Sequence, residues 1–260
     1  MPETKILFLR VGIDRGCGGR LSPVEADGRF EYVPIPEGAP VHNAMRYADI
    51  PSRRGGTIAQ VIGMDAPAHY DPEFVTYSYG EPGHPKRSQL LTLSPGDYLV
   101  FYAGFQGDGI ATGTCCVIGY FVVRSVHAMN PELPWPPDIA SRLNNAHFRR
   151  VQREDKLVVV EGDKERSRLL ERAVPISDGV QQIVPSVANT FGFSGSVKRA
   201  IGRWVRRRTL ALQLLGSRLW LEEHQRIHGR RHQAHCDSCG APVALEWDRG
   251  VQLRYGKKSP

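Results

Sequence analysis

The feature that most limits the fold is an apolar run, Tyr98 to Phe105, directly after the turn Pro95-Gly96-Asp97. This run has the length of a β-strand and falls far short of the roughly 18 apolar residues of a membrane-spanning helix. A second apolar run, 115–126, follows a glycine-rich stretch at 107–113. Two apolar runs joined in this way predict a β-hairpin at the centre of a sheet.

Further short apolar segments lie between connections rich in glycine and proline, and they predict five more strands, at 6–13, 30–35, 74–79, 157–161 and 169–176. Pro134-Trp135-Pro136-Pro137 marks a boundary, and a helix is expected from Pro137 to about Arg150, because proline is favoured in a first helical turn. Serial strands with one intervening helix predict an α+β fold, with a mixed and mostly antiparallel, barrel-like sheet.

Positive charge is concentrated at one end of the chain. The net charge is +7, and residues 193–260 alone hold 14 Lys/Arg against 5 Asp/Glu. Residues 196–229 consist mostly of helix formers, with apolar and basic residues on different faces, so a basic helical tail is expected. The arginines expected to contact a nucleic-acid backbone are Arg199, Arg203, Arg206, Arg207 and Arg208. A solvated helix and a protein-binding amphipathic helix are the alternatives.

The tail also holds a possible metal site. Cys236 and Cys239 form a C-x-x-C pair followed by glycine, the usual shape of a zinc knuckle. His228 and His232 are one helical turn apart and complete the set, with His235 as the alternate ligand. We therefore expect a structural zinc ion; ordinary thiols are the alternative. The five cysteines are too few and too scattered for a secreted disulfide framework, and the first residues lack the features of a secretion signal, so a cytoplasmic location is expected.

Two places carry candidate acid–base residues. His69, Asp71 and Glu73 alternate, so an extended backbone places them on one face, as a metal or an acid–base cluster requires. Pro72 interrupts that strand, and many surface loops offer a similar set. His147, near the end of the expected helix, is a second candidate, although a single histidine is more often structural. His147, His69 and Asp71 are the predicted catalytic residues.

Several other polar residues are candidates for binding a substrate. Lys86, Arg87 and Ser88 combine two cations with a hydroxyl, which suits a phosphate. Arg10 and Asp14 lie at the end of the first expected strand, where a surface ion pair is equally plausible. The glycine-rich loop around Cys17 has neither the spacing of a phosphate-binding loop nor a partner for a nucleophilic thiol, so it is interpreted as a turn.

Several short ordered blocks resemble the nucleotide-modification-associated domains of the third type, over roughly residues 4 to 200. They are VGID at 11–14, DGRFEYVPIPE at 27–37, HYDPEF at 69–74, KRSQLLTLSPGDYLVFYAGF at 86–105, IGYF at 118–121, NAHF at 145–148 and SRLLERAVPIS at 167–177. The central blocks are also similar to the core hairpin of PUA-like domains, whose small barrels read modified or flipped bases. The resemblance implies a PUA-like barrel and an association with altered bases, and it adds Tyr102 and Asn145 to the substrate-binding candidates.

The sequence thus predicts a PUA-like domain over residues 1–192 and a basic helical tail with a zinc knuckle over 193–260. The expected function is a module that binds a nucleotide or an extruded base, with a nucleic acid or a nucleotide as partner. The alternative is an enzyme of transferase or hydrolase type that acts on a base or a nucleotide through the His/Asp residues. Convergence of the polar side chains in one place would favour the enzyme.

Overall fold

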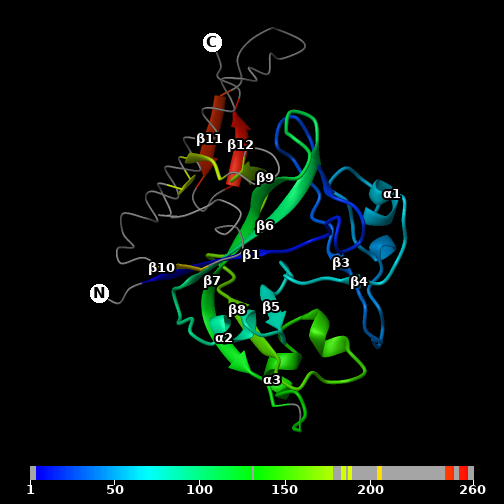
Figure 1. Ribbon diagram of the computed structural model, residues 1–260, viewed down its shortest axis with the longest axis vertical. Coiled ribbons are helices and arrows are strands. Elements are labelled where there is room, and N and C mark those ends of the chain that lie inside the picture. Colours follow the sequence, from blue (N-terminus) through cyan, green and yellow to red (C-terminus); the bar gives the residue numbers. More distant parts are fainter. Residues whose placement is uncertain are drawn as a thin grey trace.

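A long hairpin of β6 (Tyr98–Gly107) and β7 (Thr114–Ala128) runs through the centre of the molecule (Figure 1). This computed structural model describes residues 4–130, 132–177, 183–185 and 187–188, together with the backbone of 204–206, 244–248 and 252–256. Both hairpin strands are rich in apolar and aromatic residues, and Gly107 and Gly113 adopt positive φ at the two ends of the connection. The predicted hairpin and its connection are confirmed.

The hairpin is extended on both sides into a mixed sheet. On one side β6 pairs in parallel with β1 (Lys5–Arg10) and β2 (Ser22–Val24), and β1 pairs antiparallel with β10 (Trp204–Arg206). On the other side β7 pairs antiparallel first with β9 (Arg168–Pro175) and then with β8 (Val158–Gly162), whose other neighbour is β5 (Ser78–Glu81). The prediction of a mixed, mostly antiparallel sheet is confirmed.

The change of partner along β7 coincides with irregularities in its pairing. The register shifts between Val117 and Gly119 and again between Val123 and Ser125. The sheet path runs from β10 to β5, and these two end strands do not pair with each other in the described part of the chain. The described strands therefore form an open sheet, and the PUA-like barrel remains unconfirmed.

Short helices and strands make up the other described elements (Figure 1). They are η1 (Tyr47–Asp49), α1 (Ile58–Ile62), α2 (Lys86–Leu90), α3 (Pro137–Ala140), η2 (Ala146–Arg149), the pair β3 (Ile35–Pro36) with β4 (Ala68–His69), and the hairpin β11 (Ala244–Asp248) with β12 (Gln252–Gly256). Thr57 precedes α1, and Gly63 ends it in the left-handed region. Among the described residues, no helix has the length and apolar character to cross a membrane.

Two predicted strands are largely wrong. Residues 30–34 are all buried, but their pairing with neighbouring strands is limited to isolated contacts such as the bridge of Phe30 to Val24 in β2, so only Ile35 of the predicted strand 30–35 belongs to a strand. In the segment 74–79, the first four residues form a turn and the strand begins at Ser78. The carboxylate of Glu73 accepts the backbone N–H of Thr76 at 2.9 Å, which stabilises the turn.

The two predicted helices also differ from the structure. The helix begins at Pro137 as expected but ends at Ala140, and a separate turn, η2, follows Asn145, whose side chain accepts the backbone N–H of His147. Asparagine competes with the helix for backbone hydrogen bonds, so it favours a cap over a helix interior. Residues 204–206, inside the predicted helix 196–229, form strand β10, so the helix prediction is wrong there. The other residues of 196–229 lie outside the described ones.

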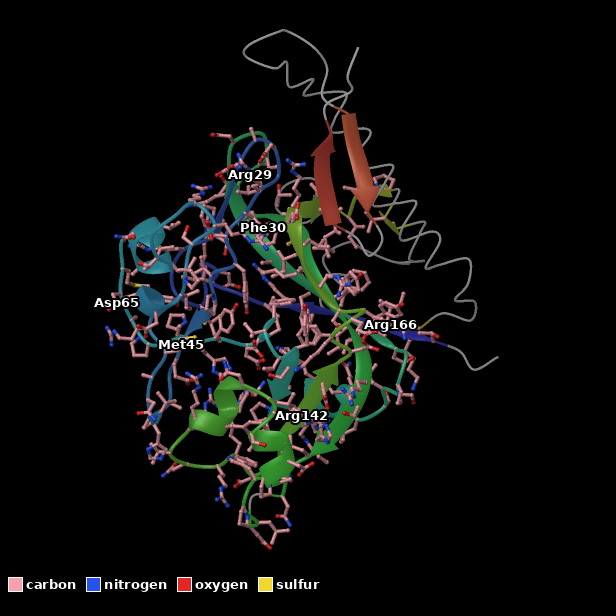
Figure 2. The ribbon with its side chains drawn as sticks, turned by 180° about the vertical axis from the view of Figure 1, so that it is seen from behind. Arg29, Phe30, Met45, Asp65, Arg142 and Arg166 are labelled. Atoms are coloured by element: carbon pink, nitrogen blue, oxygen red, sulfur yellow. The ribbon has the colours of Figure 1, made fainter. Side chains whose placement is uncertain are left out.

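An aromatic cluster fills the centre of the main core. Phe121 is fully buried, with its ring centroid 4.7 Å from that of Phe101 and 5.3 Å from that of Phe74. A Cβ atom at Gly119 would lie 2.7 Å from the Phe74 ring, so Phe74 packs directly on the β7 backbone. The side chains fill the interior from Phe30 near one end to Arg142 near the other (Figure 2). This packing fixes the segment that precedes Phe74, which holds His69 and Asp71.

We expect Phe121→Ala to lower the free energy of unfolding by about 3–5 kcal/mol, because the truncation leaves a cavity among three aromatic rings. Urea denaturation followed by circular dichroism measures the change. The control is Val75→Ala, at a side chain that is 74% exposed, where a change within about 0.5 kcal/mol is expected. Equal effects of the two substitutions would contradict the assigned core.

Candidate functional site

Two segments that are distant in the sequence bring His69, Asp71 and His147 together. His69 lies in β4, opposite Ile35 of β3, and Asp71 follows two residues later. His147 lies in η2, after its cap Asn145. Only 3–7% of each of the three residues is exposed to solvent. We call these residues the His–Asp–His centre.

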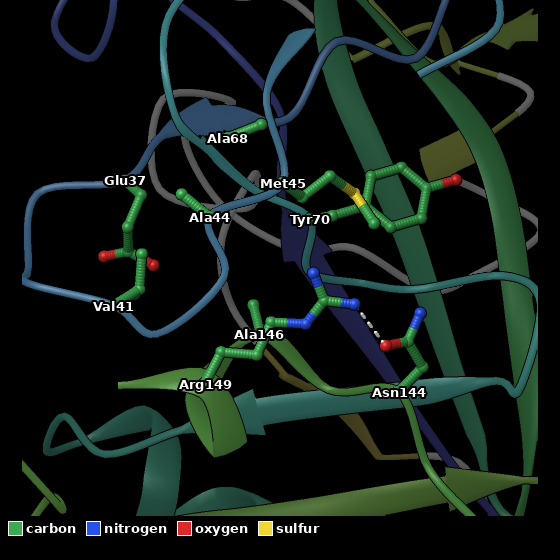
Figure 3. Close-up of a pocket in the computed structure, with 9 residues that line it drawn as sticks. All are labelled: Glu37, Val41, Ala44, Met45, Ala68, Tyr70, Asn144, Ala146 and Arg149. Atoms are coloured by element: carbon green, nitrogen blue, oxygen red, sulfur yellow. Dashed lines mark hydrogen bonds between the residues drawn. The ribbon is translucent and has the colours of Figure 1, made fainter. Parts of the chain in front are cut away.

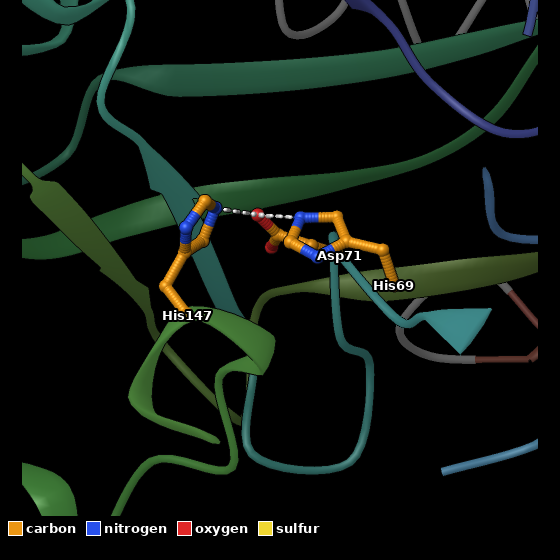
Figure 4. A group of neighbouring side chains, drawn as sticks. All are labelled: His69, Asp71 and His147. Atoms are coloured by element: carbon orange, nitrogen blue, oxygen red, sulfur yellow. Dashed lines mark ion pairs between the residues drawn. The ribbon is translucent and has the colours of Figure 1, made fainter. Parts of the chain in front are cut away.

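The three side chains face one another through lone-pair atoms (Figure 4). The Asp71 Oδ2 atom lies 3.4 Å from His147 Nε2 and 3.9 Å from His69 Nε2. The two imidazole rings are nearly perpendicular, with centroids 4.7 Å apart. One ligand atom from each residue fits within 4.8 Å of the other two, the only group of this kind among the described histidine, cysteine and acidic residues.

A carboxylate holds the other nitrogen of each histidine. Glu37 Oε2 lies 2.6 Å from His69 Nδ1, and Glu154 Oε2 lies 2.8 Å from His147 Nδ1. Ionised carboxylates only accept hydrogen bonds, so each Nδ1 carries the proton. Both histidines therefore turn Nε2 toward Asp71.

Arg150 links the two outer carboxylates. Its Nη2 atom lies 3.0 Å from Glu37 Oε1, and its Nη1 atom donates to Glu154 Oε1. Arg150 reaches both because the segment around Val41 pairs with the backbone at Arg150. The polar contacts thus close into one circuit, which we call the charge ring. Its members are Arg150, Glu37, His69, Asp71, His147 and Glu154.

Asp71 is also fixed by hydrogen bonds from two groups other than the histidines. Its Oδ1 atom accepts a hydrogen bond of 3.2 Å from Asn145 Nδ2, and the backbone N–H of Gly80 donates to Oδ2 at 2.9 Å. A Cβ atom at position 80 would lie 2.4 Å from His147 Cδ2 and 2.8 Å from Asn145 Oδ1. Position 80 therefore requires glycine so that η2 can approach β5.

The charges in the ring shift the protonation of its members. Burial lowers the pKa of His147, but hydrogen bonds to the Asp71 and Glu154 carboxylates outweigh it and raise the pKa to about 9. Burial raises the pKa of Glu37, but contacts with His69, the Ala39 N–H and Arg150 outweigh it and lower the pKa to about 2. The pKa of Glu154 is lowered by His147 and Arg150 against the opposing effect of burial. The surroundings of His147 thus favour positive charge.

A buried tyrosine near the centre has no polar partner among the described residues. The Tyr32 hydroxyl is buried, and within the described part of the chain it makes no hydrogen bond. Burial raises the pKa of Tyr32, and the proximity of Tyr70 and Asp71 raises it further. A buried hydroxyl ordinarily has a partner, so an unsatisfied one beside a polar cluster is a place where a bound group could make a hydrogen bond.

A small pocket lies beside the His–Asp–His centre (Figure 3). Its lining residues are Glu37, Val41, Ala44, Met45, Ala68, Tyr70, Asn144, Ala146 and Arg149. Ala68 and Tyr70, on either side of His69, and Ala146, next to His147, line the pocket. The pocket and the centre are therefore formed by adjacent residues of the same segments. Glu37 belongs to both, because it lines the pocket and bonds to His69.

The structure divides the predicted substrate-binding residues into three groups. Arg10 pairs with Asp14 at 3.4 Å and lies close enough to Tyr102 to oppose the increase in its pKa that burial causes. Lys86, Arg87 and Ser88 lie in α2, where Lys86 pairs with Glu81 at 3.3 Å. Asn145 belongs to the His–Asp–His centre through Asp71. No hydrogen bond or ion pair of the described residues joins one group to another.

The surroundings of Glu73 and Cys17, two other candidates from the sequence, argue against a role for them at the centre. Glu73 is fully buried and bonds to the turn that follows it, so it lies apart from the histidines. Cys17 is exposed, and burial together with the Asp14 charge raises the pKa of its thiol, which disfavours the thiolate of a nucleophile.

Most of the tail residues lie outside the described ones. They are Arg199, Arg203, Arg207, Arg208, His228, His232, Cys236 and Cys239. Arg206 lies in β10, of which the structure describes only the backbone. The phosphate grip and the zinc knuckle therefore stay predictions.

The sequence reasoning missed Glu37, Glu154 and Arg150. Glu37 is 32 positions before His69 along the chain, so no local spacing reveals its contact. Glu154 and Arg150 follow His147 within a short polar segment. Their closeness to His147 in the sequence is the only feature that could have indicated these contacts.

Comparison with known proteins gives one match. A family model described as "Nucleotide modification associated domain 3" matches residues 5–218, which is most of the chain. The match extends past residue 192, where the sequence predicted a boundary. No curated protein and no solved structure matches the chain.

We expect Arg150→Gln to lower the free energy of unfolding by roughly 3 kcal/mol, because it leaves two buried carboxylates without their cation. Arg149→Gln is the matched control, since the polar side-chain contact of Arg149 is with Asn144 at an exposed position. There we expect a change below about 1 kcal/mol. Chemical denaturation measures both, and similar values would show that the charge ring contributes nothing to stability.

Proposed function

The chain belongs to the nucleotide modification associated domain 3 family, and from this premise we propose that it is an enzyme acting on a nucleotide or a nucleobase at the His–Asp–His centre. The observation that carries the proposal is the convergence of His69, Asp71 and His147 in a nearly dry site. Buried ionisable groups with mutually perturbed protonation are typical of reaction centres. A module that only binds a nucleotide would not require two histidines to face one carboxylate.

The arrangement is suited to proton transfer. Each histidine is oriented by a carboxylate on Nδ1, as in hydrolases and transferases that use histidine as an acid or a base. Asp71 stands between the two Nε2 atoms and could hold a positive charge there. In our proposal His69 and His147 exchange protons with the substrate, while Asp71 positions them. Glu37 and Glu154 fix the tautomer.

Two of the residues that line the small pocket beside the centre are of types that bind nucleotides. Tyr70 offers an aromatic ring, on which a base can stack, and Arg149 offers a cation for a phosphate. Glu37 connects this pocket to His69. A nucleotide that contacts Tyr70 and Arg149 would therefore have its reacting part next to the charge ring.

We expect cells that produce the wild-type chain to contain a nucleoside that is altered or missing compared with cells that lack it. His147→Gln should abolish this difference, because the substitution removes the ionisable ring at the centre. Mass spectrometry of nucleosides from the nucleic acids and from the nucleotide pool measures it. The control is His127→Gln, a half-buried histidine that also bonds to a carboxylate, Glu161, but lies outside the charge ring.

Two results of this experiment would contradict the enzyme. One is a His147→Gln chain that alters nucleosides as well as the wild type does. The other is a wild-type chain that alters none while the purified protein still binds nucleotides. The second result would favour the alternative function, a module that reads a nucleotide or an extruded base.

A second part of the proposal concerns the tail. Residues 193–260 carry 14 basic against 5 acidic residues, which suits contact with nucleic-acid phosphates. We expect affinity for duplex DNA or RNA to fall as salt rises, and replacing Arg203 and Arg207 by Ala to flatten the logarithmic salt slope by about two. Titration of labelled nucleic acids at two salt concentrations tests this. Absence of binding even at low salt would rule out a phosphate grip.

A further inference from the structure

We infer that the His–Asp–His centre holds one divalent first-row transition-metal ion, with His69 Nε2, a carboxylate oxygen of Asp71 and His147 Nε2 as its ligands. This inference rests on the proposed function and refines it, because an ion bound to both Nε2 atoms would leave the acid–base role to its bound water, with the two imidazoles as ligands.

Three atoms that can act as acceptors converge at the centre. Both Nδ1 atoms carry protons that point to Glu37 and Glu154, so an imidazole without a second proton presents an Nε2 lone pair to Asp71. These lone pairs and the Asp71 carboxylate repel one another unless something positive lies between them. A proton satisfies one pair of atoms, whereas a metal ion at the same place satisfies all three.

The charges of the ring also favour a cation at the centre. Asp71, Glu37 and Glu154 contribute three carboxylates, and Arg150 contributes the one guanidinium that neutralises part of their charge. With neutral imidazoles, two negative charges remain in a largely buried place, and unpaired buried charge is strongly unfavourable. A divalent cation balances this charge.

The groups behind the ligands are of the kind found behind metal ligands. Metal-binding histidines ordinarily donate their other N–H to a carboxylate or a carbonyl, which fixes the tautomer and strengthens the ligand. Both histidines meet this condition, through Glu37 and Glu154. The Oδ1 atom of Asp71 is held by Asn145 at 3.2 Å, so its orientation is fixed as well.

The ligand atoms are close enough to bind a small ion after the centre contracts. Two ligands of a tetrahedral ion with bonds of about 2.0 Å stand roughly 3.3 Å apart. The His147 Nε2 to Asp71 Oδ2 distance is 3.4 Å, and the His69 Nε2 to Asp71 Oδ2 distance is 3.9 Å. Three protein ligands leave a position for water or substrate, as in catalytic sites.

The donor set indicates the class of metal. Two imidazole nitrogens and one carboxylate suit zinc, iron, manganese or nickel, whereas magnesium and calcium prefer oxygen alone. The unpartnered Tyr32 hydroxyl, buried in the neighbourhood of Asp71, is a group that could bond to a ligand of the ion. The site also differs chemically from the zinc knuckle predicted in the tail, because it contains no thiolate.

The test is titration of the purified full-length chain with Zn²⁺ after dialysis against a chelator. To exclude the tail, the chain carries Cys236→Ser and Cys239→Ser. We expect one equivalent of Zn²⁺ to bind. Adding His69→Gln or His147→Gln should weaken binding by about 100-fold or more, and adding Glu37→Gln or Glu154→Gln by roughly 10–100-fold. His127→Gln, outside the charge ring, should leave the affinity unchanged.

Two outcomes would overturn the inference: no Zn²⁺ bound by the chain with both cysteines replaced, or equal binding after the His69 and His147 substitutions. The first would mean that the ring is an ion-pair network held by protons. If the histidine variants do not fold, NMR of that same chain decides. Zn²⁺ must then shift the Nε2 resonances of His69 and His147, and unshifted resonances would overturn the inference.

The titration contains no nucleotide, so it separates the metal site from the proposed function. A chain that binds Zn²⁺ at the centre but alters no nucleoside would contradict the enzyme and leave the metal site in place. A chain that alters nucleosides through His147 without binding the ion would retain the enzyme and overturn the metal site.

Discussion

The burial of the Asp71 carboxylate is the constraint on which the architecture around the site depends. A carboxylate that is almost fully buried must be paired or hydrogen-bonded, or it is neutralised. The partners of Asp71 come from its own segment, from Gly80 in β5 and from Asn145 and His147 before and within η2. Three distant segments must therefore meet, and the glycine at position 80 allows the closest of these approaches.

The sheet provides the rigid support for this meeting. Phe74, three residues after Asp71, packs on the backbone of Gly119 and on the ring of Phe121, so the central hairpin anchors the segment that carries His69 and Asp71. β8 positions β5, which supplies the Gly80 N–H. The functional side chains thus lie in short, irregular pieces, while the strands behind them supply the packing energy.

The sequence was most informative where apolar residues are continuous. The predicted strands that correspond to β6, β7, β8 and β9 are confirmed. Their apolar patterns are strong, and they pair with one another: β7 pairs with β6, β8 and β9. The expected strand at 30–35 and the long helix after Pro137 are wrong, because buried loops and asparagine caps depend on tertiary contacts that local spacing does not encode. For the same reason the sequence indicated His69, Asp71 and His147 as candidates by their residue types, whereas it did not indicate Glu37 and Arg150.

The charge ring explains why these polar groups can coexist in the interior. Each histidine lies between two carboxylates, and Arg150 joins the outer pair, so the ring orients every member but leaves an excess of negative charge at its centre. An arrangement selected only for stability would gain more from apolar side chains of similar volume, since buried ion pairs contribute little net stabilisation. The excess negative charge is instead concentrated between two imidazole nitrogens and a carboxylate, where a cation or a reacting proton can bind.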